Sequence, residues 1–141
     1  MDVVLVKPLT FMNRSGRAVL ELVRHYELEP VDLLVVSDDT TLPLGSLRMR
    51  PEGSAGGHNG LRSIEESLGG PGYPRMRLGV GNAEMDRWPL EDFVLDVFRE
   101  DEQPVVEDLL DYAADAARLW IVEDLESAVA RFNRRVSLDA E

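Results

Sequence analysis

The chain contains no cysteine, and only two of its 141 residues are histidine. The first absence excludes disulfide bonds and thiolate metal sites. The two histidines, His25 and His58, have no paired carboxylates at metal-ligand spacing, so the sequence does not support a metal site. No apolar run approaches the length of a membrane span, and no signal-peptide pattern is present. With 44% hydrophobic residues, the composition predicts one cytoplasmic globular domain without a metal, a cofactor or a membrane partner.

Lysine is also scarce: 14 of the 15 basic residues are arginine. Acidic residues exceed basic ones, and the net charge is −12. The acidic excess is uneven: residues 1–87 hold 10 basic against 12 acidic residues, whereas residues 88–141 hold 5 against 15. Within residues 43–81 five arginines oppose three glutamates. Such a patch can bind phosphate on an acidic protein, because charges beyond about 8 Å are largely screened. Genomic base composition explains the preference for arginine equally well.

The apolar pattern predicts strands that alternate with helices. Short apolar runs at residues 3–6 and 33–36 are typical of strands buried on both faces. Alternation at residues 47–50 and 75–80 is typical of half-exposed strands, whose arginines share one face. Helical spacing is present in residues 18–26, 60–68, 105–117 and 125–132. This order predicts an α/β fold with a mixed sheet.

A glycine-rich turn precedes the predicted helix at residues 60–68. Gly56 and Gly57 let the backbone approach a ligand closely, and Asn59 can cap the helix. The unpaired N–H groups of a helix start suit a phosphate, a carboxylate or a developing oxyanion. Taken alone, the pattern is better explained by an ordinary turn and cap, so its meaning depends on the rest of the chain.

Two other positions carry polar groups beside predicted strands. Asp38 comes just after the apolar run at residues 33–36 and ends the predicted strand. The ends of such strands are where α/β sheets usually open their ligand crevice. A carboxylate there can orient an imidazole, although it can also be a simple turn acid. The carboxamides of Asn13 and Asn59 can hold a water, a ribose hydroxyl or an ester carbonyl, and each is explained locally as a cap.

Several motifs stand in an order that resembles bacterial peptidyl-tRNA hydrolase. They are Lys-Pro-Leu-Thr-Phe-Met-Asn at residues 7–13, the apolar strand to Asp38-Asp39, Leu-Pro-Leu-Gly at residues 42–45 and Gly-Gly-His-Asn-Gly-Leu at residues 56–61. Residues 73–81 and 93–95 also look like that family, so the resemblance runs from Val3 to about Arg131. It implies a single-domain α/β/α sandwich that hydrolyses the ester between a peptidyl group and the 3′ ribose of tRNA.

The resemblance also assigns roles to individual residues. It implies that Asp38 pairs with the family's catalytic histidine, and that Asn13 and Asn59 line the cleft for the peptidyl-adenosine end of tRNA. His58 is implied as a neighbour of the cleft and not as the base, and Phe11 as an aromatic that could pack on substrate. The residues expected to face the tRNA are Arg48, Arg50 and Arg75. No cofactor or metal is implied, and a monomer is expected where the full-length domain is present.

One element of the family has no counterpart in the sequence. Its members open with a strand, a Gly-Asn-Pro-Gly turn and a Thr-Arg-His-Asn stretch that holds the general-base histidine. The chain would then be a single domain over residues 1–141 that lacks the family's first strand, turn and helix, through a misplaced start, a fragment or natural shortening. General-base catalysis contributes about 10²–10⁴-fold, so weak activity is expected. The alternatives are a catalytically dead RNA-binding relative and a remnant that does not fold alone.

Overall fold

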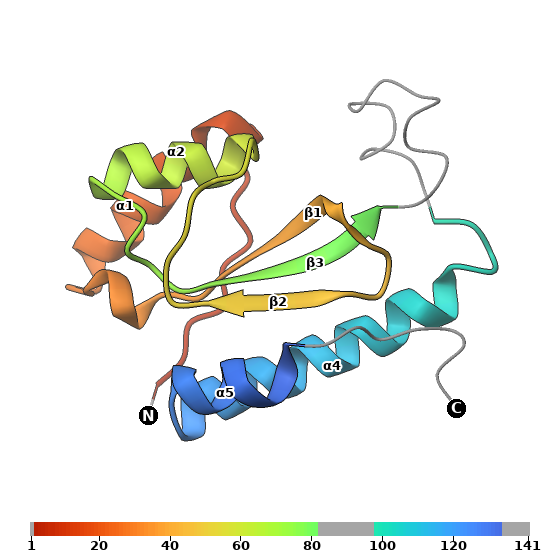
Figure 1. Cartoon of the computed structure of the whole chain (residues 1–141). Coiled ribbons are helices and arrows are strands. Elements are labelled where there is room, and N and C mark those ends of the chain that lie inside the picture. Colours follow the sequence, from red (N-terminus) through yellow and green to blue (C-terminus); the bar gives the residue numbers. More distant parts are fainter. Residues whose placement is uncertain (1, 82–97, 134–141) are drawn as a thin grey trace. The chain divides into compact units, whose positions relative to one another are not determined.

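A computed structural model describes residues 2–81 and 98–133 (Figure 1). Residues 82–97, which include the segment at 93–95, lie outside the described residues. The elements follow in the order η1 (Met12–Arg14), α1 (Ser15–His25), η2 (Pro30–Asp32), β1 (Val35–Pro43), β2 (Leu47–Arg50), α2 (Asn59–Leu68), β3 (Arg75–Gly81), α4 (Gln103–Val122) and α5 (Leu125–Phe132).

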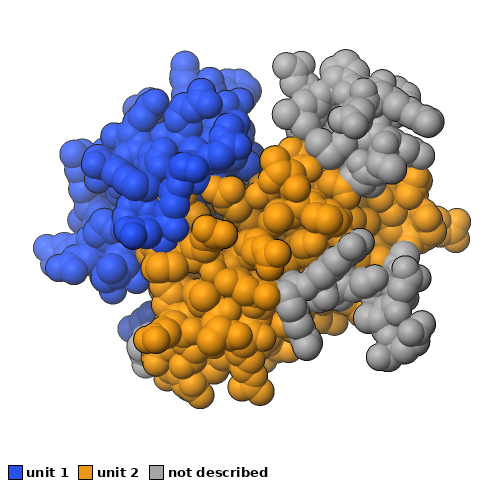
Figure 2. All heavy atoms as spheres, in the orientation of Figure 1, with its two compact units in different colours: residues 1–33, 52–73 blue, residues 34–51, 74–141 orange. Residues whose placement is uncertain are grey.

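The chain divides into two compact units, which Figure 2 distinguishes by colour. Unit 1 consists of Met1–Leu33 and Glu52–Tyr73, and unit 2 consists of Leu34–Pro51 and Pro74–Glu141. Each unit is formed from two separate stretches of sequence. The expectation of one domain over the whole chain therefore stays a prediction.

Unit 2 contains the sheet. Its strand order is β1-β3-β2, with β1 parallel and β2 antiparallel to β3, so the sheet is mixed as expected. The helices α4 and α5 run along the sheet (Figure 1), and side chains of β2 and β3 pack on them. The buried residues of this core are Leu47, Met49, Met76, Leu109, Ala113, Ala116 and Ala128. Burial of such apolar surface is the main stabilising contribution to a unit of this kind.

Unit 1 contains the helices α1 and α2, which pack against each other. Leu61 and Ile64 of α2 are buried, and Tyr73 is buried as well, with its hydroxyl donating to the carbonyl of Leu61 at 3.2 Å. The helix α2 ends at Gly69, whose φ of 81° is the left-handed conformation that favours glycine at a helix end. The predicted helix at residues 60–68 is thus confirmed to within one residue.

The predicted strand at residues 3–6 is not formed. These residues carry no strand pairing, and Leu5 is 93% exposed. A strand exists only where a neighbouring strand accepts and donates its backbone hydrogen bonds. Apolar composition alone could not reveal that the described residues supply no such neighbour.

Strand β1 differs from the prediction as well. It begins at Val35 and runs to Pro43, which is longer than the predicted run at residues 33–36. Asp38 therefore lies within the strand and not at its end. Because aspartate is depleted in strands, Asp38 and Asp39 favoured an early stop, whereas the two threonines that follow them are compatible with a strand.

Candidate functional site

The first candidate segment is the tight turn that carries Asn13. Residues Met12–Arg14 form the 3-10 turn η1, in which the Arg14 N–H donates to the carbonyl of Phe11 at 2.8 Å. The Ser15 hydroxyl donates to the carbonyl of Met12 at 2.7 Å and holds the turn from its other side. Asn13 is exposed in the middle of this turn, so its carboxamide is available to a ligand.

The second candidate segment is the start of α2. His58, and not Asn59, is the N-cap, because its Nδ1 accepts the N–H of Leu61 at 3.2 Å. Asn59 is the first helical residue and is exposed. The turn before it depends on Gly56 and Gly57, whose φ values of 58° and 84° are unfavourable for other residues. The expected cap at Asn59 was wrong because a histidine nitrogen can accept an amide hydrogen as a carboxamide oxygen does.

The cap fixes the chemistry of His58. A neutral imidazole whose Nδ1 accepts a hydrogen bond must carry its proton on Nε2. In that tautomer the ring offers a donor and not a base to its surroundings. That His58 is a neighbour of the site and not its base stays a prediction.

The two asparagine segments are held together by small residues. A Cβ atom at Gly60 would meet the Met12 Sδ at 2.6 Å, so η1 lies directly against the first turn of α2. One turn further along, the N–H of Gly16 donates to the Ser63 Oγ at 2.9 Å. A Cβ at Gly16 would overlap the carbonyl oxygen of Ser63. Unit 1 therefore brings the segments of Asn13 and Asn59 together through close backbone contact.

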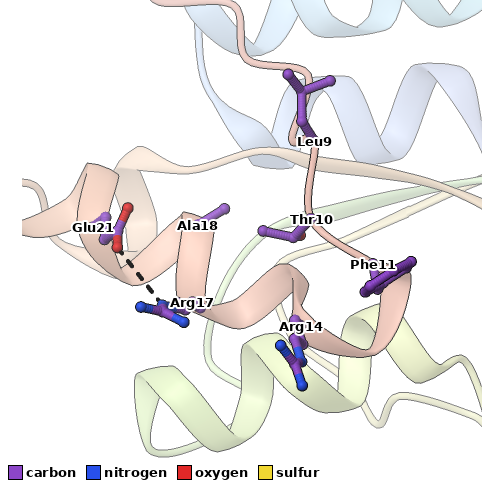
Figure 3. A pocket seen from close by; sticks show the side chains of 7 residues that line it. All are labelled: Leu9, Thr10, Phe11, Arg14, Arg17, Ala18 and Glu21. Carbon is purple, nitrogen blue, oxygen red and sulfur yellow. Dashed lines mark ion pairs between the residues drawn. The ribbon is translucent and has the colours of Figure 1, made fainter.

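A cavity lies beside η1 in unit 1 (Figure 3). It has a volume of about 330 Å³ and is lined by Leu9, Thr10, Phe11, Arg14, Arg17, Ala18 and Glu21. Phe11 is 79% exposed, which excludes the core position that its aromatic ring alone would suggest. The Arg17 Nε lies 3.9 Å from the Glu21 Oε1, so one of the two guanidinium groups is partly neutralised. An aromatic face beside arginines suits a ligand that combines an apolar or planar group with negative charge.

In unit 2 the two neighbouring aspartates have different surroundings. Asp39 is buried; its Oδ1 accepts the N–H of Thr41 at 2.8 Å, and its Oδ2 lies 3.4 Å from Arg77 Nη1. Asp38 is half-buried and pairs with Leu78 in the register. Because successive side chains of a strand point to opposite faces, the side chain of Asp38 projects from the face opposite to that of Asp39. Asp39 is thus occupied by structural contacts, and a role of Asp38 in a site stays a prediction.

The arginines of β2 and β3 share one face of the sheet. Arg48 opposes Arg77 and Arg50 opposes Arg75, so like charges stand directly opposite each other in two pairs. Arg48 and Arg50 are exposed, as predicted, whereas Arg75 is only 1% exposed. Burial of Arg75 argues against the predicted direct contact between its guanidinium group and tRNA.

Some contacts that fix these segments were not predicted. The Asn133 side chain binds the edge of β2, since its Oδ1 accepts the N–H of Met49 at 2.6 Å and its Nδ2 donates to the carbonyl of Met49 at 2.9 Å. Glu102 is buried and accepts the N–H of Arg99 at 2.9 Å.

Within residues 2–81 and 98–133, no group of three or more histidine, cysteine or acidic residues could hold a metal ion. The same residues include no helix that is long and apolar enough to cross a membrane.

Comparison with known proteins agrees with the motif order. The family model for peptidyl-tRNA hydrolase matches residues 1–139. The chain is 47% identical over 131 residues to the peptidyl-tRNA hydrolase of Desulforudis audaxviator, covering 93% of this chain and 65% of that protein. It is 43% identical over 132 residues to that of Desulfitobacterium hafniense, covering 94% of this chain and 71% of the relative. The chain belongs to the peptidyl-tRNA hydrolase family.

Solved structures of peptidyl-tRNA hydrolases have the same fold as this chain. The crystal structure of peptidyl-tRNA hydrolase from Acinetobacter baumannii superposes with a TM-score of 0.80 at 30% sequence identity. The match covers 91% of this chain and 64% of the solved chain. The α/β fold class with a mixed sheet is thereby confirmed. The chain spans about two thirds of the length of the solved relatives it matches.

Proposed function

We propose that the chain acts on peptidyl-tRNA, cleaving the ester between the acyl group and the 3′ ribose so that the tRNA returns to translation. The observation that supports this most is the identity of 43–47% to peptidyl-tRNA hydrolases, which covers 93–94% of the chain. Such an activity would operate in the cytoplasm. The chain would act as one domain and need neither metal nor cofactor.

Within this proposal the carboxamides of Asn13 and Asn59 hold the ester carbonyl, the ribose hydroxyl or the attacking water. Their segments lie together in unit 1, and both side chains are exposed. Asp38 orients the group that accepts the proton of the water. Phe11 packs on the substrate's acyl or adenine group, and the exposed pair Arg48 and Arg50 binds phosphates of the acceptor arm.

We further propose that the 141 residues hydrolyse this ester slowly. Neither histidine is suited to be the general base: His58 uses Nδ1 as a helix cap, and His25 is exposed at the end of α1 with its ring 4.7 Å from that of Tyr26. A well-placed base contributes about 10²–10⁴-fold to such a reaction. The remaining polar groups would still bind and orient the substrate.

The test is hydrolysis of N-acetyl-aminoacyl-tRNA by the purified chain, with the Desulforudis relative measured in parallel. The chain should be at least about 10²-fold slower, and added imidazole should raise its rate because it supplies the missing proton acceptor. The rate with imidazole should fall in Asn13→Ala and Asn59→Ala but stay unchanged in Gln103→Ala, an exposed carboxamide on α4. A rate equal to that of the relative without imidazole would refute the slow-enzyme proposal.

The arginine face of unit 2 favours a second function, the binding of RNA without hydrolysis. On this face Arg48 lies opposite Arg77, and Arg50 lies opposite Arg75. The hydroxyl of Ser37, which pairs with Arg77 in the register, is buried without a hydrogen-bond partner among the described residues. Arg77 is paired with Asp39, so the exposed guanidinium groups of Arg48 and Arg50 are the ones that could bind phosphate. Binding of tRNA should weaken steeply with salt, and Arg48→Ala should reduce the salt slope by about 1, whereas Arg24→Ala should not. Undetectable binding at low salt would exclude this function.

A further inference from the structure

Asn59 is followed by a glycine, and this pair of residues is chemically labile in an open chain. Glycine follows an asparagine nowhere else in the 141 residues. A glycine has no Cβ atom to obstruct its own backbone nitrogen, so that nitrogen can attack the side-chain Cγ of the asparagine before it. In this reaction the nitrogen of Gly60 loses its proton and bonds to Cγ, and the side-chain amide leaves as ammonia. Water then opens the resulting succinimide to aspartate or isoaspartate.

The structure holds this pair in a conformation that does not react. Asn59 is the first residue of α2, and a helical ψ, typically about −42°, directs the Gly60 nitrogen away from the side-chain Cγ. The turn is secured at His58. Its carbonyl accepts the N–H of Arg62 at 3.0 Å, and its Nδ1 accepts the N–H of Leu61 at 3.2 Å. The reaction therefore requires the first turn of α2 to open.

Gly60 is also enclosed by side chains. It is buried, although Asn59 beside it is exposed. A Cβ atom at Gly60 would lie 2.6 Å from the Met12 Sδ and 2.9 Å from the His58 Cε1. A sulfur from η1 and the imidazole ring thus both lie over this residue. Opening of the first turn has to displace these two side chains.

We propose that Asn59 is a deamidation site that His58 and Met12 keep closed. The reaction proceeds through the small population in which the first turn of α2 is open, because helix ends unfold locally more readily than the rest of a fold. Loss of either side chain raises that population, and the rate of deamidation rises with it. The product carries a negative charge at the start of α2, and its isoaspartate form also lengthens the backbone there. The reaction does not depend on whether the chain hydrolyses peptidyl-tRNA.

Mass spectrometry of the tryptic peptide at residues 49–62 measures the reaction, because Asn59 is the only asparagine or glutamine in that peptide. The chain is incubated at mildly alkaline pH, at a temperature where circular dichroism shows each variant folded. A synthetic peptide with the sequence of residues 54–66 gives the rate in an open chain. The folded chain should react at least about tenfold more slowly than this peptide. Equal rates would overturn the proposal.

Two pairs of variants test the closure from different sides. His58→Ala removes the cap and should speed deamidation about fivefold, whereas His58→Ser supplies a capping oxygen and should recover most of the protection. Met12→Ala uncovers Gly60 and should also speed the reaction, whereas Met12→Leu, of similar volume, should not. Because Met12 is remote in sequence, its substitution cannot alter the intrinsic reactivity of the Asn59-Gly60 pair. The proposal fails if either alanine variant deamidates no faster than its matched partner. If one pair failed to fold, the other would decide by the same comparison.

Discussion

Unit 1 and unit 2 hold their candidate residues by different means. In unit 2 the sheet rests on α4 and α5 through fully buried side chains such as Leu47, Met49 and Met76. In unit 1 the helix α1 meets α2 at Gly16, where an added Cβ would collide with the Ser63 carbonyl, and η1 meets α2 at Gly60, where it would meet the Met12 side chain. The positions of Asp38 and of the arginines thus depend on an ordinary apolar core. The positions of Asn13 and Asn59 depend on close contacts at glycine residues.

This difference has consequences for how each unit responds to change. An apolar core loses stability in proportion to the volume that is removed. A close backbone contact is insensitive to loss of volume but sensitive to any addition, since added atoms force the helices apart. Substitutions that remove atoms should therefore be most harmful in unit 2, and those that add atoms should be most harmful in unit 1.

The largest expected effect is that of Met49→Ala in unit 2. Met49 is fully buried between the sheet and the helices, so truncation leaves a cavity and should cost about 2–5 kcal/mol in the free energy of unfolding. Urea titration followed by circular dichroism measures this. Arg48→Ala, the exposed neighbour on the same strand, should stay within about 0.5 kcal/mol. Equal shifts for both variants would show that β2 does not cover the core as described.

The next effect is that of Gly16→Ala in unit 1. Alanine is the better helix former, but its Cβ would overlap the Ser63 carbonyl, and a net loss of about 1–3 kcal/mol is expected. Gly70→Ala is the matched control, because nothing lies within 4 Å of the added atom. Stabilisation by Gly16→Ala in thermal melts would contradict the close contact of α1 with α2. Hydrolysis in the presence of imidazole should decrease in parallel, because the contact positions Asn13 and Asn59.

The sequence predicted the elements of both units better than it predicted the contacts between them. Periodicity located α2, β2, β3, α4 and α5, because each element has one apolar face that local pattern reveals. It failed for residues 3–6, because a strand requires a partner that lies elsewhere in the chain. It also placed Asp38 at a strand end, since acidic residues signal a stop locally whereas pairing with β3 extends β1 to Pro43.

The candidate site was predictable only in part, for a related reason. The residue types and their order pointed to Asn13, Asn59 and Asp38, but the cap at His58 and the burial of Arg75 follow from tertiary packing. Whether Asp38 serves the same site as the two asparagines stays a prediction.

A smaller effect is expected where α5 is tied to the edge of the sheet. Asn133→Ala removes both hydrogen bonds to Met49 and leaves its backbone groups unpaired, which should cost about 1–2 kcal/mol in urea titrations. Asn133→Asp keeps the acceptor but loses the donor, so its cost should be intermediate. If Asn133→Ala and Asn133→Asp were both neutral, the side chain would not be part of the support of β2.

The smallest effect concerns the pH dependence of unit 2. The N–H of Ser127 donates to Asp124 Oδ1 at 2.6 Å at the start of α5, and this bond, together with one from the Ser127 side chain, lowers the pKa of Asp124. A carboxylate whose pKa is lower in the folded state stabilises the fold above its unfolded pKa of about 3.9 and loses this contribution as the pH falls through the folded value. Asp124→Asn keeps a capping oxygen without the charge. The melting temperature of the unmodified chain should therefore exceed that of Asp124→Asn by a small, constant amount near pH 6, and the difference should shrink below pH 4. Asp115→Asn, at an exposed position of α4, serves as the control, and a difference that grew on acidification would contradict the cap.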